Sequence, residues 1–389
     1  MERHTVVLVP VSDYDEQKVT EAVNTGISLL GGWECFVSKD EKILLKPNLL
    51  TGSLPQKAVT THPAVFGAVA ASLREAGYRY LQYGDSPGNP ATSPEKAADT
   101  SGILEQAEKY GVERADFDGG CVVRFPEGKT ARSFYLCTGV QQADALISIC
   151  KMKTHALERI TGAVKNQYGC ICGVNKAAGH ALYPSSEKFA EMLTDLHRCV
   201  KPRLHIMDGI TAMEGNGPSS GTPVQMNVLL FSADPVALDT VFCNLIDLDP
   251  VSVPTCTAGA HAGIGTMNPD EIRIVTPDGE ISAERAAELY GKADFDVFRE
   301  KLRKSLFMKF LPLLPSLQHR PKADMKRCVG CGICQEACPV PEKAVKSGNG
   351  KKAEYDYKKC IRFYCCQEMC PVKAISVYRS PLNKLLGGK

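Results

Sequence analysis

The spacing of the cysteines near the C-terminus constrains this chain more than any other feature. Eight of its 17 cysteines lie in the last 62 residues, in two runs that each end in Cys-Pro. The first run, Cys328 to Pro339, has the spacing C-x2-C-x2-C-x3-C-P. Three thiolates of such a run hold one 4Fe-4S cubane, and the fourth reaches a second cubane. Zinc sites typically show two C-x2-C pairs and four ligands, so the doubled run favours iron–sulfur clusters over zinc or a disulfide scaffold.

The second run departs from this spacing. Its cysteines are Cys360, Cys365, Cys366 and Cys370. A regular repeat requires a cysteine at position 363, which is Phe363. Either Cys365 replaces the missing ligand, or one cluster has an iron without a cysteine and is labile. Ligand counting favours replacement, because two cubanes need eight thiolates and eight are present. The predicted ligands are then Cys328, Cys331, Cys334 and Cys370 for one cluster, and Cys338, Cys360, Cys365 and Cys366 for the other.

Length and composition predict a large domain followed by a small module. A chain of 389 residues exceeds an ordinary single domain, and a hydrophobic content of 44% permits a substantial core. No stretch approaches 18 consecutive apolar residues, and the N-terminus lacks the basic start and long apolar run of a signal peptide. Nine further cysteines lie before residue 300. Free thiols in this number suit a reducing compartment, so we expect a cytoplasmic location.

The charge is distributed unevenly along the chain. Residues 301–389 contain 19 Lys and Arg against 6 Asp and Glu, which leaves 27 against 38 in residues 1–300. Part of the basic excess neutralises the clusters, and the rest can attract an acidic electron donor. No aromatic-basic platform or recognition helix accompanies it, so we expect no nucleic-acid partner. An amphipathic basic stretch at 295–322 is interpreted as a connector helix, with peripheral membrane contact as the less favoured alternative.

The first 294 residues predict an α/β domain with a mainly parallel sheet flanked by helices. The predicted strands are Thr5–Val9, Lys42–Lys46, Tyr80–Tyr83, Ala145–Ile149, Leu204–Met207, Val228–Phe231 and Ile272–Val275. The predicted helices are Tyr14–Leu30, Pro63–Ala76, Pro94–Tyr110, Ser186–Val200 and Pro235–Ile246. The expected organisation is therefore a body (1–294), a connector (295–322) and a small α+β ferredoxin-like module with two clusters (323–389).

Polar clusters follow several predicted strands, where parallel sheets place their ligands. They are Lys46 to Asn48, Gly84 to Gly88, Lys151 to His155, Asp208-Gly209 and Glu214 to Gly217, and the segment Thr161 to Gly173 adds further polar groups. Taken singly, each cluster is explained by turn composition or helix capping. Taken together, they predict a pocket for a small anionic or carbonyl substrate. The candidate charge stabilisers are Lys46, Lys153 and Lys165, and the candidate proton donors are Asp85, His155 and Tyr168.

No cofactor for a two-electron step is evident in the body. The chain has no phosphate-binding Gly-x4-Gly-Lys-Ser loop and no well-placed Gly-x-Gly-x2-Gly fingerprint. Cys170-x-Cys172 offers a close thiol pair, but its spacing supports neither a metal site nor a specific thiol chemistry. Electrons are therefore expected from a protein donor of the ferredoxin or flavodoxin type, and any additional cofactor in the body stays undefined.

The body resembles domain-of-unknown-function family 362, and the tail resembles the ferredoxin-type module often fused to it. The residues that carry the likeness are Lys46-Pro-Asn48, Gly84-Asp-Ser-Pro-Gly88, Lys151-Met-Lys153-Thr-His155, Gly162-Ala-Val-Lys-Asn166, and Asp208-Gly209 with Asp234 to Asp239. The resemblance spans nearly the whole chain. It implies an iron–sulfur protein of anaerobic or low-oxygen metabolism, and it supplies no substrate.

Three functions are compatible with these patterns. The leading hypothesis is an oxidoreductase whose module passes low-potential electrons to a small substrate in the body. The first alternative is a non-catalytic electron-transfer or assembly partner whose body binds another protein. The second is a redox-sensing protein in which the clusters tune affinity for an anionic ligand.

Overall fold

The chain divides into two compact units, each with its own secondary structure. The computed structural model describes residues 4–88, 92–173, 175–183, 185–299 and 320–378. The first unit comprises Met1–Lys176 and Ser185–Val297, and the second comprises Ala177–Pro184 and Phe298–Lys389. Most of the predicted connector, residues 300–319, lies outside the described residues.

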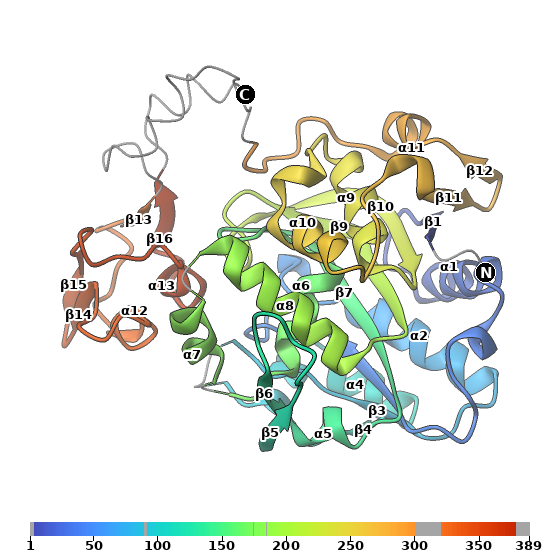
Figure 1. Cartoon of the computed structure of the whole chain (residues 1–389), viewed down its shortest axis with the longest axis horizontal. Coiled ribbons are helices and arrows are strands. Elements are labelled where there is room, and N and C mark those ends of the chain that lie inside the picture. The colour runs from blue at the N-terminus through green and yellow to red at the C-terminus, as the bar shows by residue number, and fades with distance from the viewer. Residues whose placement is uncertain (1–3, 89–91, 174, 184, 300–319, 379–389) are drawn as a thin grey trace. The chain divides into compact units, whose positions relative to one another are not determined.

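The first unit is built on one large mixed sheet (Figure 1). Within the described residues, ten strands form this sheet, in the order β12-β11-β1-β10-β9-β7-β2-β3-β4, with β8 paired to β7. The strands are β1 (Thr5–Pro10), β2 (Ile43–Pro47), β3 (Leu81–Tyr83), β4 (Glu113–Arg114), β7 (Ala145–His155), β8 (Arg159–Thr161), β9 (Leu204–Glu214), β10 (Thr222–Ser232), β11 (Arg273–Thr276) and β12 (Gly279–Ile281). Strands β8, β10 and β12 run against the others, so the predicted mainly parallel sheet is confirmed.

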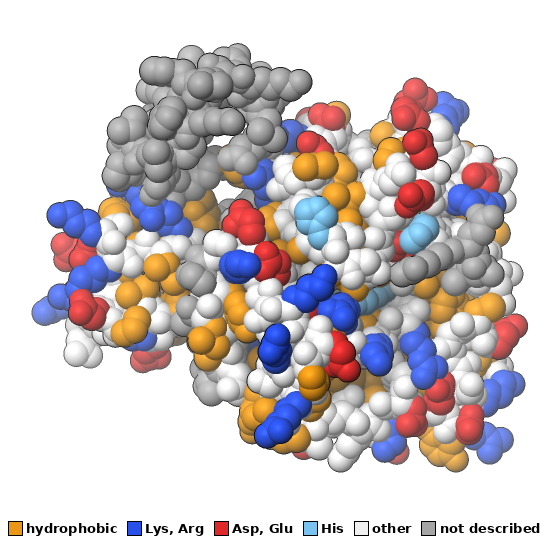
Figure 2. Space-filling view, in the orientation of Figure 1, with side chains coloured by type: hydrophobic (Ala, Val, Ile, Leu, Met, Phe, Trp, Pro, Cys, Tyr) orange, Lys and Arg blue, Asp and Glu red, His pale blue; other side chains and the backbone are white. Residues whose placement is uncertain are grey.

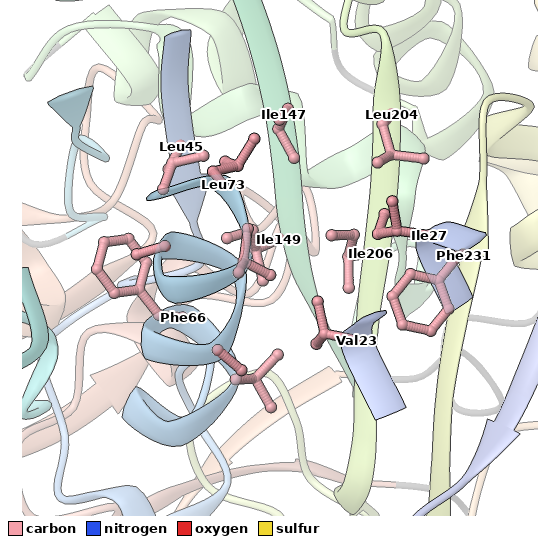
Figure 3. Close-up of a cluster of buried hydrophobic side chains, with 14 of the residues drawn as sticks. Val23, Ile27, Leu45, Phe66, Leu73, Ile147, Ile149, Leu204, Ile206 and Phe231 are labelled. Atoms are coloured by element: carbon pink, nitrogen blue, oxygen red, sulfur yellow. The ribbon is translucent and has the colours of Figure 1, made fainter. Parts of the chain in front are cut away.

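Helices cover both faces of this sheet (Figure 1). They are α1 (Glu16–Leu29), α2 (Pro63–Glu75), α3 (Pro94–Thr100), α4 (Ile103–Lys109), α5 (Thr138–Gln141), α6 (Ala163–Asn166), α8 (Ser186–Val200), α9 (Pro235–Leu245), α10 (Pro254–His261) and α11 (Ala283–Tyr290). Figure 3 shows α1 and α2 packing apolar side chains such as Val23 and Phe66 against Ile147 and Ile206 of the sheet. The alternate strand residues, such as Leu8 and Leu230, are equally buried and point to the opposite face, because strand side chains alternate.

Most predicted elements are present, with changed lengths. All seven predicted strands form, but the three assigned to 145–149, 204–207 and 228–231 are extended as β7, β9 and β10. The helix predicted at Pro94–Tyr110 is two helices, α3 and α4, because the chain leaves the helical conformation at Gly102, whose φ is 75°. A hairpin of β5 (Gly120–Arg124) and β6 (Ser133–Cys137) was not predicted.

In its described residues, the second unit contains short helices and two small antiparallel sheets, which confirms an α+β module. Strand β13 (Arg320–Ala323) pairs with β16 (Ile375–Tyr378), and β14 (Val345–Gly348) pairs with β15 (Lys351–Tyr355). The helices are α7 (Asn175–Leu182), which begins in the first unit, α12 (Ile333–Glu336) and α13 (Cys365–Glu368). No helix among the described residues is both long and apolar enough to cross a membrane. Acidic and basic side chains are interspersed over the face of the first unit seen in Figure 2.

Candidate functional site: clustered thiols and a buried polar network

The two cysteine runs of the second unit share one backbone conformation. In the first run, Gly330 and Gly332 have φ values of 69° and 85°. At the corresponding positions of the second run, Arg362 and Tyr364 have φ values of 60° and 61°, although neither is a glycine. The short helices α12 and α13 follow at equivalent points. A left-handed conformation is costly for such residues, so the surrounding structure must impose it on the second run.

The shared backbone conformation shows which residue of the first run corresponds to each residue of the second, irregular run. Phe363 occupies the position of Cys331, Cys366 that of Cys334, and Cys365 that of Ile333. The Phe363 ring is buried and packs edge-on against His180 of α7, with ring centroids 5.2 Å apart. Phe363 therefore packs against other side chains where the first run has a cysteine ligand, and the second run has an additional thiol two residues later, at Cys365.

Four thiols of the second unit line one cavity: Cys338, Cys360, Cys365 and Cys366. Backbone amides donate hydrogen bonds to three sulfurs of the two runs. The Ala353 amide donates to Cys328 at 3.4 Å, and the Ala344 amide donates to Cys338 at 3.4 Å. The Ala374 amide donates to Cys370 at 3.2 Å. Such donors stabilise the negative charge of thiolates bound to a cluster and tune its potential.

The thiols fit a cluster better than a single metal ion. Burial raises the pKa of the Cys366 thiol to about 12, so a bound cation is needed to hold it as a thiolate at neutral pH. In the described part of the chain, no three His, Cys, Asp or Glu side chains converge as ligands of one ion. A cubane requires no such convergence, because each of its cysteines binds a different iron.

In the first unit, two predicted site residues form a buried ion pair. Lys46, the penultimate residue of strand β2, places Nζ 2.8 Å from Oδ1 of Asp85, and their side chains are 0% and 3% exposed. The other oxygen, Oδ2, accepts a hydrogen bond from the Leu49 amide at 2.7 Å. Gly169 packs directly on the pair, because a Cβ there would lie 1.7 Å from Oδ1 of Asp85. The ammonium and the carboxylate therefore satisfy each other inside the protein.

Two asparagines extend this pair to Lys153. The Lys153 ammonium donates to Asn48 Oδ1 at 2.8 Å and to the Val59 carbonyl at 2.6 Å. Asn48 Nδ2 in turn donates to Asn166 Oδ1 at 3.1 Å, and Lys46 lies 3.4 Å from the same oxygen. The structure thus brings together Lys46, Asp85 and Lys153 of the six residues predicted for the body site.

The other three predicted residues have different positions. His155 ends β7 and accepts hydrogen bonds at Nδ1 from the amides of Leu157 and Glu158, both at 3.1 Å, so it caps the turn into β8. Tyr168 is buried and donates to the Lys176 carbonyl at 2.6 Å. Lys165 is half-buried on α6.

The expectation that all five polar clusters follow strands was wrong for two of them. Residues 151–155 lie inside β7, and Asp208-Gly209 lies inside β9, whereas Glu214 is the last residue of β9 and Gly217 follows that strand. The sequence predicted shorter strands here, because lysine and aspartate interrupt the apolar runs. They continue because the charges are buried in pairs: Lys151 Nζ lies 2.6 Å from Asp208, which also accepts a hydrogen bond from Tyr14 at 2.9 Å.

Glu158, which follows His155 in this turn, was not predicted. Its side chain is fully buried, and among the described residues neither carboxylate oxygen has a hydrogen-bond partner. Burial raises the pKa of Glu158 to about 8, against the opposing effect of the Lys165 ammonium. A carboxyl that keeps its proton near neutral pH is suited to proton transfer. No sequence signal distinguishes it, because Glu in a short turn is ordinarily exposed.

This pKa predicts a pH-dependent stability. Because the folded state holds the Glu158 proton up to about pH 8 and the unfolded state releases it near the ordinary value, stability should fall as pH rises between these values, by at most about 1.4 kcal/mol per pH unit. Replacing Glu158 with Gln should flatten this fall, as measured by urea unfolding from pH 5 to pH 8. The exposed Glu105→Gln on α4 is the matched control. Parallel pH profiles for wild type and Glu158→Gln would contradict the prediction.

These features define an iron–sulfur protein with an α/β body. Residues 43–244 match the family described as "Domain of unknown function (DUF362)", and residues 320–371 match the "4Fe-4S dicluster domain". The chain belongs to the first of these families, and its C-terminal module is of the ferredoxin-like electron-transfer class.

One similar protein is named for its association with the thylakoid. The chain is 34% identical over 274 residues to the thylakoid-associated protein sll1697 of Synechocystis sp., across 70% of this chain and 83% of that protein. The apoprotein of a lactate racemase from Thermoanaerobacterium thermosaccharolyticum is 10% identical, with a TM-score of 0.39 over 62% of this chain and 56% of that chain. A Thermotoga maritima protein has a TM-score of 0.34, with 10% identity over 64% and 59%. The chain covers less than two thirds of the length of each of these two solved structures.

Proposed function

We propose that this protein is a redox protein with two 4Fe-4S clusters, whose C-terminal module accepts low-potential electrons singly and passes them to the body. The observation that carries the proposal is the convergence of Cys338, Cys360, Cys365 and Cys366 on one cavity. That set is the one expected when the fourth cysteine of each run crosses to the other cluster. The remaining thiols, Cys328, Cys331, Cys334 and Cys370, would hold the other cluster. When bound, each cluster would store one electron.

The body would provide the electron acceptor. In the oxidoreductase form of the proposal, a small anionic or carbonyl substrate binds near the network of Lys46, Asp85 and Lys153. One observation favours the non-catalytic alternative, in which the body binds another protein. The Lys46 and Lys153 side chains are fully buried, and both donate to acceptors inside the protein. Substrate binding there would require these internal hydrogen bonds to be exchanged.

The partner and the location follow from the same proposal. An acidic donor of the ferredoxin or flavodoxin type suits the basic C-terminal residues, because opposite charges steer association. We retain a cytoplasmic location as the prediction. Peripheral contact with a membrane is its alternative, supported by the thylakoid association in the name of the Synechocystis relative.

Metal and sulfide analysis of anaerobically purified protein tests the proposal. We expect about eight iron and about eight sulfide per chain, and about half of each in Cys331→Ser, because serine is a poor ligand for iron in a cubane. The exposed Cys121→Ser in β5 is the control and should retain the full content. Zinc in place of iron and sulfide would overturn the proposal, and a full iron content in Cys331→Ser would overturn the ligand assignment.

A further inference from the structure

Two buried thiols of the body lie against the same carbonyl group. Cys137 ends β6, and Cys172 follows the 3-10 helix Gln167–Cys170. Their sulfurs approach the Phe117 carbonyl oxygen at 4.0 and 3.9 Å. The two segments are also joined directly, because the Cys172 amide donates to the Tyr135 carbonyl at 3.0 Å. Both thiols are therefore fixed in neighbouring positions on adjacent backbone segments.

A lysine ammonium lies close to these thiols. Burial raises the pKa of Cys137, the neighbouring Cys172 thiol raises it further, and the Lys176 ammonium opposes the shift. Lys176 is itself buried and donates to the carbonyls of Ser86 and Pro87. Burial lowers the pKa of Lys176 to about 8. A cation beside a thiol favours the thiolate, so Lys176 partly offsets the effect of burial, which keeps the net pKa of Cys137 above its usual value.

We propose that Cys137 and Cys172 form a reversible disulfide that collects electrons from the two clusters in pairs. This inference rests on the proposed function, which provides the electron source. In the reductive direction, each reduced cluster gives one electron, the S–S bond breaks, and two protons are taken up to give two thiols. In the oxidative direction, each oxidised cluster takes up one electron, the two thiols lose two protons, and the S–S bond forms. A dithiol is a two-electron couple, and the sequence shows no other two-electron cofactor in the body.

Other thiols of the body fit this role less well. Cys243 and Cys256 are neighbours and fully buried, but the groups that shift the pKa of Cys256 are Cys243, burial, and the carboxylates of Asp239 and Asp234, all of which oppose the thiolate. Cys170 lies near Cys137, but its sulfur contacts Gln167 at 4.0 Å instead of the Phe117 carbonyl.

The chain links this dithiol to the cluster-bearing unit. Soon after Cys172, the residues from Ala177 to Pro184 belong to the second unit. Within that unit, His180 packs against Phe363, which lines the cavity of the four thiols. Cys172 of the first unit and His180 of the second are therefore eight residues apart in sequence.

Differential alkylation tests the pairing without any substitution. Anaerobic protein is treated with ferricyanide or with dithiothreitol, denatured, alkylated, digested and analysed by mass spectrometry. We expect a linked pair of peptides containing Cys137 and Cys172 after oxidation, and two alkylated thiols after reduction. Cys170→Ala should leave the linked pair in place, whereas Cys172→Ala should abolish it. Complete alkylation of both thiols after oxidation would overturn the proposal, as would a pairing that involves Cys170.

Reductive titration then tests the coupling. With dithionite, the oxidised wild-type chain should take up about four electrons, two for the clusters and two for the disulfide. Cys172→Ala should take up about two and keep the electron paramagnetic resonance signals of both reduced clusters. Uptake of about two electrons by wild type with intact cluster signals would overturn the disulfide and leave the proposed function standing. Absent cluster signals would instead overturn the proposed function.

Discussion

Replacing Cys365 with serine is expected to remove one of the two clusters and about half of the iron. Cys365 is buried, lines the same cavity as Cys338, Cys360 and Cys366, and stands where the first run has an isoleucine. Without Cys365, only three thiolates would remain for the four irons of this cluster, and each iron needs a protein ligand. Iron and sulfide analysis, together with the electron paramagnetic resonance spectrum of the reduced protein, measures the loss.

Cys170→Ser is the matched control for this experiment. Cys170 is also buried, but it lies in the first unit beside Gln167. Its replacement should leave the iron content unchanged. If both variants retain iron equally, Cys365 is not a ligand and the second cluster has an iron without a cysteine.

A second substitution can restore the lost ligand. The left-handed residues Arg362 and Tyr364 give the second run the backbone of the first, in which the residue between them is Cys331. The double variant Phe363→Cys with Cys365→Ser should therefore recover iron that the single variant loses. Recovery is expected to be incomplete, because the Phe363 ring also packs against His180. No recovery would mean that the two runs do not present their thiols alike.

The sequence predicted the cysteine module and the main strands because both depend on local patterns. Ligand spacing is set by a few adjacent residues, and an apolar run such as Val6 to Val9 identifies a strand wherever it lies. The same reasoning from local sequence wrongly predicted the end of β7, because Lys151 and Lys153 were interpreted as the start of a loop. Their strand continues because Asp208 of β9 and Asn48 after β2, far away in sequence, provide their partners.

The burial of single polar groups could not be predicted from local sequence patterns either. Glu158 and the neighbouring thiols of Cys137 and Cys172 acquire their environment from contacts between segments that are distant in sequence. The sequence did single out Lys46 and Asp85 as candidate site residues, since each follows the apolar part of a parallel strand. It did not show that they are paired and shielded from water, which changes their expected role.

The largest effect on stability is expected from Lys46→Met. The substitution keeps much of the side-chain volume and leaves the Asp85 carboxylate buried without its counter-ion, and breaking such a pair typically costs about 3–5 kcal/mol. Urea unfolding measures this change. Lys18→Met is the control: Lys18 pairs with Asp13 at a similar N–O distance of 2.7 Å, but both side chains are about half exposed. Exposed pairs contribute at most about 1 kcal/mol.

Adding Asp85→Asn to Lys46→Met should recover part of the lost stability. Asparagine removes the uncompensated charge and keeps an oxygen that can accept the Leu49 amide hydrogen bond. Recovery would show that the cost of Lys46→Met is electrostatic and that the pair supports the fold. If Lys46→Met were instead as stable as Lys18→Met, the ammonium would not be needed to hold Asp85 in the body. The oxidoreductase form of the proposal would then gain support, because a lysine that the fold can lose is free to serve a substrate.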